Sequence, residues 1–269
     1  MNALLETLTS NFSILWPALI AGVLVSLTHV PLGQQVLRRG IVFIDLAVAQ
    51  VAGVGVVTAH TLGLELQGWM TQIAAVSAAL GGALILTWTE RKRPEVQEAL
   101  IGVMFVVAST VQILLLANDP HGGEDLKDLL AGQILWVTPE QLWRAAFVTA
   151  AFLALWWTVG SRLGRIGFYT LFAVVVTVSV QLVGVYLVFT SLIVPAIATY
   201  RHPAGRQLWL GVALAVASYV VGLVVSAVTD LPTSALVVPV MVVIGVFVHL
   251  ASPRNATNSL TQPDAAETR

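Results

Sequence analysis

Long apolar segments separated by short polar ones run through most of this chain. The apolar segments lie at about residues 13–31, 41–60, 70–89, 98–117, 142–160, 166–199, 207–229 and 233–251. A helix needs about 20 apolar residues to cross a hydrocarbon layer about 30 Å thick. Lipid also forces backbone polar groups to pair within helices. The pattern therefore predicts an all-α fold, a polytopic transmembrane helical bundle with about eight to nine membrane crossings.

The segment 166–199 has an unusual length, because its 34 residues contain no Asp, Glu, Lys, Arg or His. This is too long for one straight span and too short for two full ones. Gly184 and Pro195 are the positions where a helix would break. We expect a full crossing followed by a shorter helix, which ends at Pro195 and delivers a basic turn to one membrane face.

Basic residues cluster after alternate apolar segments, and these clusters predict the orientation. They comprise Arg38, Arg39, Arg91, Lys92, Arg93, Arg162, Arg165, Arg201 and Arg206. With the N-terminus outside, all of them are cytoplasmic, provided that 166–199 crosses and returns. Of the 13 Lys and Arg residues, only Lys127 and Arg144 then lie outside. Because cytoplasmic loops carry the excess of Lys and Arg, we expect an N-out, C-in topology.

Composition excludes several classes of function. The chain is 57% hydrophobic and 10% charged, with a formal net charge of −1 and no cysteine. It offers no basic surface for nucleic acid and no disulfide or thiolate site. It lacks the P-loop, H-E-x-x-H and G-x-S-x-G motifs, so it is not expected to be an enzyme. We expect one transmembrane domain over 1–252 and a disordered cytoplasmic tail over 253–269.

Two polar residues in the second apolar segment are candidates for the transport pathway. A carboxylate within a span, such as Asp45, costs several kcal/mol when unpaired and usually has a function. Alternatively, it lies near the interface and pairs with Arg38 or Arg39. Gln50 lies near the middle of the span, where its amide either lines a pore or bridges two helices. Since five residues separate them, the two side chains point about 140° apart.

His60 ends the same segment, and Glu65 follows it. Imidazole and carboxylate groups suit a transition metal, although a histidine there is also typical of an interfacial polar residue. The long connection 118–141 contains the amphipathic stretch DLKDLLAG, which is suited to lie in the interface. Gln112 and Gln181 are further amides within spans. Periodicity does not indicate which helices are neighbours, so these residues cannot be assembled into one site.

Three stretches resemble the zinc/manganese-type ABC permeases, usually called the ABC-3 family. LVGVYLVFTSLIVPAIATYR (182–201) follows the family pattern of Val-Gly, an apolar stretch, Leu-Ile-x-Pro-Ala-x-x-Ala and a basic residue. LRRGIVFIDLAVAQVAGVGV (37–56) is similar to the family's Asp/His-containing span. DLLAGQILWVTPEQL (128–142) is similar to its outer Leu-Leu-x-Gly segment. The matches occur in the expected order and cover roughly residues 20–250.

The resemblance implies a permease subunit of an importer for divalent metal, zinc or manganese, in the cell (inner) membrane. It implies a homodimer with cytoplasmic ATP-binding subunits, an extracytoplasmic metal-binding protein that delivers the ion, and no covalently bound cofactor. A helix at about 195–208 would dock on the ATPase, through Pro195, Ala196, Arg201, His202 and Arg206. The alternatives are a secondary carrier or channel without ATPase coupling, or a membrane-embedded enzyme.

The chain departs from the family at the residues that contact metal. Aligned on Gly55, the family's histidine falls at Gln50 and its aspartate at Leu46, next to Asp45. Neutral Gln is a poorer zinc ligand than imidazole. We expect alternating access along a pathway lined by Asp45, Gln50 and His60, with Asp45 and Gln50 as the candidate metal contacts.

Overall fold

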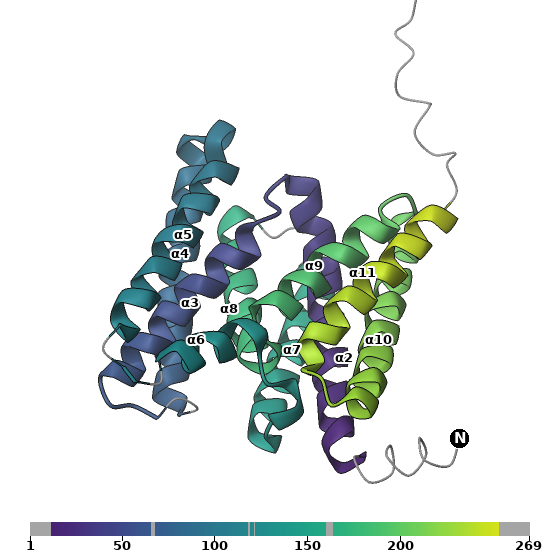
Figure 1. The fold of residues 1–269 in the computed structure, drawn as a ribbon. Helices are drawn as coiled ribbons and strands as arrows, with labels where there is room; N and C mark the ends of the chain where they lie inside the picture. Colours follow the sequence, from purple (N-terminus) through teal and green to yellow (C-terminus); the bar gives the residue numbers. More distant parts are fainter. Residues whose placement is uncertain (1–11, 66–67, 118, 121, 160–163, 253–269) are drawn as a thin grey trace, which may run out of the picture.

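The structure is a computed structural model that describes residues 12–65, 68–117, 119–120, 122–159 and 164–252. These residues form a helical bundle without β-strands (Figure 1). Its helices are α2 (Phe12–Arg39), α3 (Ile44–Thr61), α4 (Trp69–Lys92), η1 (Pro94–Val96), α5 (Gln97–Leu116), α6 (Gly122–Ala131), η2 (Ile134–Trp136), α7 (Pro139–Val159), α8 (Arg165–Val183), α9 (Val185–Thr199), α10 (Ala204–Thr229) and α11 (Thr233–Ala251). The predicted tail at 253–269 lies outside the described residues.

The prediction of a polytopic helical bundle is confirmed. Over the described ranges, eight helices are long and apolar enough to cross a membrane, and α9 is a shorter apolar helix of 15 residues. The first span is longer than predicted, because α2 continues through Pro31 and ends at Arg39. Proline is tolerated inside a transmembrane helix where neighbouring helices and side chains satisfy the freed backbone groups.

The bundle has two groups of helices joined by a central one. In the first group α3 packs on both α4 and α5. In the second, α9 packs against α2 and α11, and α10 packs against the same two helices. Helix α8 contacts α4 and α3 on one side and α2 and α9 on the other, so it connects the groups (Figure 1).

The predicted break within 166–199 occurs at Gly184. This residue separates α8 from α9 and has φ 82°, a left-handed conformation that favours glycine. Gly132, after α6, has φ 71° and faces Gly184 so closely that a Cβ on either would overlap the other's backbone. The segment 122–141 therefore folds back onto the break, with α6 against α9 and α8.

The prediction that the short helix ends at Pro195 was wrong. Pro195 lies inside α9, which continues to Thr199. Thr199 directs its hydroxyl back to the Pro195 carbonyl at 2.7 Å and stabilises this last turn. Pro195 is buried near Gly211 of α10, whose missing side chain leaves room for Val30 of α2. Local packing thus keeps the helix intact beyond a residue that would end it in water.

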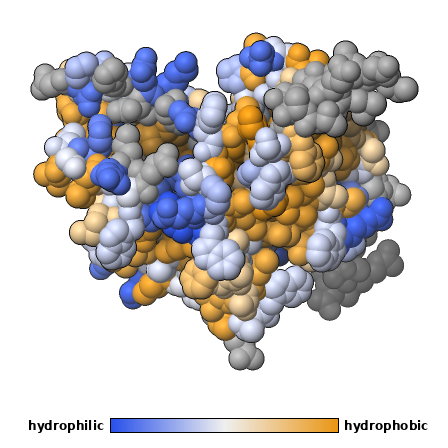
Figure 2. Space-filling view, turned by 90° about the horizontal axis from the view of Figure 1, so that it is seen from below, coloured by the Kyte–Doolittle hydropathy of each residue, from blue (hydrophilic) through white to orange (hydrophobic). Residues whose placement is uncertain are grey.

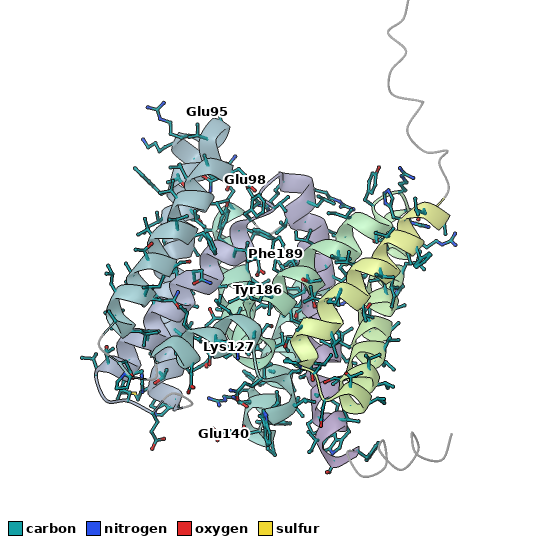
Figure 3. The ribbon with its side chains drawn as sticks, viewed as in Figure 1. Glu95, Glu98, Lys127, Glu140, Tyr186 and Phe189 are labelled. Carbon is teal, nitrogen blue, oxygen red and sulfur yellow. The ribbon has the colours of Figure 1, made fainter. Side chains whose placement is uncertain are left out.

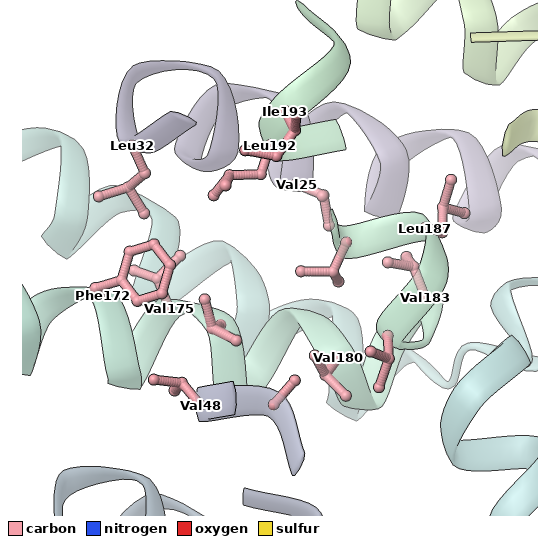
Figure 4. Close-up of a cluster of buried hydrophobic side chains, with 14 of the residues drawn as sticks. Val25, Leu32, Val48, Phe172, Val175, Val180, Val183, Leu187, Leu192 and Ile193 are labelled. Carbon is pink, nitrogen blue, oxygen red and sulfur yellow. The ribbon is translucent and has the colours of Figure 1, made fainter. Parts of the chain in front are cut away.

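A buried apolar cluster joins the two groups of helices at the centre of the bundle. It includes Val25 and Leu32 of α2, Val48 of α3, Phe172 and Val175 of α8, and Leu187 and Leu192 of α9 (Figure 4). Each of these side chains is almost completely buried. The α8–α9 break lies at the edge of this cluster, through Val180 and Val183, so its position is fixed by packing on both sides.

Polar contacts tie the helix ends that carry the predicted basic clusters, and we call this side of the bundle the basic end. Arg38 donates to Gln207 at the start of α10 (3.4 Å), and the Arg39 guanidinium lies 4.1 Å from the centre of the Phe168 ring at the start of α8. At the end of α4, Glu90 pairs with Arg165 (3.7 Å). The basic clusters that the structure describes are therefore neighbours in space.

The opposite side, which we call the loop end, carries α6, η2 and the start of α7. Figure 3 shows Lys127 and Glu140 there, whereas Glu95 and Glu98 lie at the basic end. Figure 2 views the molecule from the loop end and shows hydrophilic residues gathered beside a hydrophobic surface. The two ends thus separate the described charges in the way that the sequence predicted, with Lys127 and Arg144 away from the other basic residues.

Candidate functional site

A cavity opens at the loop end, between the outer parts of α3, α7 and α8 and beneath the α6–η2 loop. We call it the loop-end cavity; it is open to solvent on one side and has about 170 Å³ of space accessible to water. Its wall is apolar along α3 and α8, through Val56, Val57, Val180 and Leu182. The polar part of its lining consists of His60, Gln133, Gln141, Arg144 and Gln181. These residues come from segments far apart in the sequence.

The start of α7 places two of these polar residues. Thr138 and Gln141 cap each other. The backbone N–H of Gln141 donates to Thr138 Oγ1 (3.2 Å), and the backbone N–H of Thr138 donates to the side-chain Oε1 of Gln141 (2.9 Å). This is the capping-box arrangement that satisfies free amides at a helix N-terminus. Arg144 follows three residues after Gln141, on the same face of α7. The Thr-Pro-Glu-Gln sequence therefore sets where the guanidinium lies.

A smaller hollow adjoins the loop-end cavity between α4, α7 and α8. It shares Gln141, Arg144, Gln181 and Leu182 with the larger cavity and adds Gln72 of α4. The Nε2 atom of Gln181 is buried there without a hydrogen-bond partner. An unpaired buried donor costs about 1–3 kcal/mol. This polar group is therefore available to a ligand or to water.

Gln50 of α3 and Gln112 of α5 are hydrogen-bonded to each other in the protein interior, beneath the loop-end cavity. Gln112 Nε2 donates to the side-chain oxygen of Gln50 at 2.6 Å and to its backbone oxygen at 3.0 Å, which joins α5 to α3. Val57 and Leu116 line the cavity, and the two glutamines lie on the same helix faces, two turns and one turn further in. The sequence left open whether Gln50 lines a pore or bridges helices; the structure shows the bridge, below the cavity.

Asp45 does not join this site. Its side chain is completely buried, and neither carboxylate oxygen has a hydrogen-bond partner. The suggested pairing with Arg38 or Arg39 is absent from the described residues, since Arg38 reaches Gln207 and Arg39 lies over Phe168. The side chains of Asp45 and Gln50 are both buried but point in different directions from α3, as their five-residue spacing predicted.

The structure separates the other candidate metal contacts as well. His60 lines the loop-end cavity, whereas Glu65 is exposed beyond the end of α3. Among the described residues, no three His, Cys, Asp or Glu side chains are close enough to hold a metal ion. Gln141 and Arg144 were missed from the sequence, although the Thr-x-x-Gln cap before α7 was a readable signal for their position.

The basic turn lies at the other end of α9. Residues 200–203 connect α9 to α10, and Arg206 is exposed in the first turn of α10. The Tyr200 ring stacks on His249 of α11, and Arg201 lies 5.5 Å from the Tyr200 ring centre. The predicted docking helix at 195–208 was wrong in form: this segment is divided between the end of α9, the turn and the start of α10. Pro195 and Ala196 are buried.

These features define a polytopic helical membrane protein. It has a cavity at one end, a buried pair of hydrogen-bonded glutamines beneath the cavity, and a basic turn at the other end. The sequence profile of the ABC 3 transport family matches residues 11–163 and 158–252. The chain belongs to this family and is a multi-pass permease subunit of an ABC importer in the cell membrane.

Curated relatives align over most of the chain. The Listeria monocytogenes manganese transport system membrane protein MntC is 24% identical over 265 residues, covering 91% of this chain and 92% of its own. The Haemophilus influenzae high-affinity zinc uptake system membrane protein ZnuB is 24% identical over 240 residues, covering 81% and 90%.

A solved structure shares the fold. A chain of PsaBC from Streptococcus pneumoniae, in complex with Fab, superposes with a TM-score of 0.77 at 21% identity and covers 94% of this chain and 97% of that one. A second solved structure, "An inward-facing conformation of a putative metal-chelate type ABC transporter", superposes with a TM-score of 0.66 at 16% identity and covers 87% of this chain and 85% of that one.

Proposed function

We propose that the chain imports a divalent metal ion, manganese or zinc, as a homodimer driven by a separate cytoplasmic ATP-binding subunit. An extracytoplasmic metal-binding protein delivers the ion to the loop end. The names of the manganese and zinc relatives support the substrate class. The observation that carries the proposal is the loop-end cavity together with the buried Gln50–Gln112 hydrogen bond that lies deeper between α3 and α5.

The orientation that fits this function has the loop end outside and the basic end in the cytoplasm. The basic residues meet at one end of the bundle, as the topology rule for cytoplasmic loops requires. The ion enters the loop-end cavity, passes His60 and reaches the Gln50–Gln112 pair. Asp45 lies further along α3 without a hydrogen-bond partner, so we keep it on the path with His60 and Gln50.

The ATPase docks on the turn between α9 and α10. Arg201 and Arg206, with His202 between them, supply the basic surface, while the buried Pro195 and Ala196 support it from inside. Helix α9 runs from this turn to Gly184, which contacts the loop-end segment at Gly132. Motion of the docked ATPase is therefore transmitted along one short helix to the roof of the cavity.

Charge reversal at this turn tests the coupling. In proteoliposomes that contain the transporter with its ATPase, the double variant Arg201→Glu and Arg206→Glu should lose ATP-dependent uptake of ⁵⁴Mn and ⁶⁵Zn and release the ATPase during affinity purification. Arg91→Glu is the control, because it reverses an exposed charge at the same end outside the turn. Uptake of both metals at the wild-type rate in the double variant would show that the turn does not couple transport to ATP.

A further inference from the structure

The start of α3 is capped by a residue of another helix. Phe43 occupies the cap position before α3, where its own side chain makes no capping hydrogen bond. The first amides of a helix have no partner within the helix and need an acceptor from elsewhere. The backbone N–H of Phe43 donates to the Glu98 carboxylate of α5 at 3.1 Å. Because the helix dipole also favours a negative charge at this position, Glu98 supplies the cap that the α3 sequence lacks.

The ring of the same residue contacts the second group of helices. Phe43 stacks on Phe189 of α9, with the ring centres 6.3 Å apart and the ring planes 7° from parallel. This separation lies within the favourable range for aromatic pairs, which is about 4.5–7 Å. Phe189 itself packs against the buried cluster at the centre of the bundle. Figure 3 labels both partners of Phe43, Glu98 at the basic end and Phe189 on α9. One residue therefore joins the two groups, by its backbone and by its ring.

Helix α3 is otherwise fixed mainly to the first group of helices. It packs on α4 and α5, and Gln50 bonds to Gln112 of α5. In the described part of the chain, α2 is not among the helices that α3 contacts most, although the short turn 40–43 joins the two. Helix α9 packs in the second group and ends at the basic turn. The Phe43–Phe189 pair is therefore a contact between the groups, placed at the start of the helix that lines the path.

We propose that Phe43 is a positioning residue for transport, which passes a displacement of α9 to the start of α3. This inference rests on the proposed function, because the displacement is the one that the ATPase produces at the turn between α9 and α10. Phe189 lies on α9 between that turn and Gly184. Asp45 follows Phe43 by two residues, so a shift of the ring changes the surroundings of the buried carboxylate. Glu98 holds the first turn of α3 together, so that the shift moves the helix instead of unwinding it.

The ratio of metal imported to ATP hydrolysed separates positioning from stability. It is measured with ⁵⁴Mn and ⁶⁵Zn in proteoliposomes that contain the transporter with its ATPase. Phe43→Leu keeps an apolar residue but removes the ring, and should lower the ratio about two- to tenfold, the factor that corresponds to one aromatic pair. Phe43→Tyr keeps the ring and should retain the wild-type ratio. Phe147→Leu, which replaces a 70% exposed ring on α7, is the matched control.

The cap is tested in the same assay. Glu98→Leu removes the acceptor for the Phe43 N–H and should lower the ratio about tenfold, as expected for a hydrogen bond to a charged group. Glu98→Gln keeps a side-chain oxygen and should restore most of it. Glu95→Leu changes an exposed carboxylate at the same end and should leave the ratio unchanged.

A thiol label follows the start of α3 without any cargo. The chain has no cysteine, so Leu46→Cys introduces a single thiol about one turn after Phe43. Trapping the ATPase with ATP and vanadate should change the rate of maleimide labelling of this chain severalfold, measured by intact mass. Adding Phe43→Leu should abolish this response.

The outcomes separate the positioning role from the import function. A lower ratio in Phe43→Leu, together with a lost labelling response, supports the role. If uptake and ATP hydrolysis fall in equal proportion, or if a folded Phe43→Leu keeps the wild-type ratio and response, the role is overturned while the import function stands. If the wild type imports neither metal but its thiol responds to ATP through Phe43, the role stands and the proposed cargo fails. If the wild type shows neither import nor response, both fail.

Discussion

The two ends of the bundle are built differently. At the basic end, polar groups from different segments bond directly: the Phe43 backbone amide donates to the Glu98 carboxylate (3.1 Å), and the Gln97 side chain joins Thr89 (2.9 Å) and Tyr169 (3.3 Å). At the loop end, the described polar groups surround a cavity, and their bonds are mostly within one segment, such as the Thr138–Gln141 cap. The basic end is suited to hold helices in a fixed arrangement, and the loop end to separate them.

Helix α9 and its glycine contact connect these two regions. Gly184 and Gly132 bring the α8–α9 break against the loop, with no space for a side chain on either. A permease that alternates between two states needs a firm attachment for the motor and a part that opens. In this chain the bonded basic end and the cavity at the loop end are joined by one short helix, α9.

The largest effect is expected where the two regions meet. Gly184→Val places a branched side chain at positive φ and against the backbone of Gly132, so we expect a loss of about 3 kcal/mol or more in folding stability. Little folded protein should be recovered by fluorescence-detected size-exclusion chromatography. Gly102→Val, where a Cβ meets nothing within 4 Å, is the matched control. A Gly184→Val protein with the wild-type Tm would mean that the break does not depend on this contact.

Matched changes of glutamine to leucine at the two ends should have opposite effects. Gln97→Leu removes the bonds to Thr89, Tyr169 and the Leu86 carbonyl, and should lower stability by about 2 kcal/mol. Gln181→Leu removes an unpartnered donor, so the Tm should stay or rise. Thermal unfolding of both variants in the same detergent measures the difference. A larger loss in Gln181→Leu would reverse the distinction between the ends.

The smallest effect concerns the closure beneath the cavity. Gln112→Leu removes two hydrogen bonds to Gln50, each of about 0.6 kcal/mol in a membrane protein, so stability should fall by only about 1 kcal/mol. The ATP-independent leak of ⁵⁴Mn from loaded proteoliposomes should rise severalfold, because the bridge from α5 to α3 is lost. Ser109→Ala, which removes only a bond within α5, is the control. An unchanged leak would remove this pair from the path.

The sequence by itself determined the spans, the break at Gly184 and the grouping of basic residues at one end. These features follow from length, hydropathy and charge, which act along the chain wherever lipid is the solvent. It also placed Gln50 within a span. It could not show that Gln112 bonds to it, because the two residues are 62 positions apart.

Only the tertiary structure decided how the candidate residues group. It left Asp45 without a partner, joined Gln50 to Gln112, and brought His60, Arg144 and Gln181 to one cavity. It also carried α9 past Pro195, since α10 packs where a helix in water would end. The physical reason is that helix neighbours in a membrane are chosen by close packing and by polar contacts between segments, and hydropathy records neither.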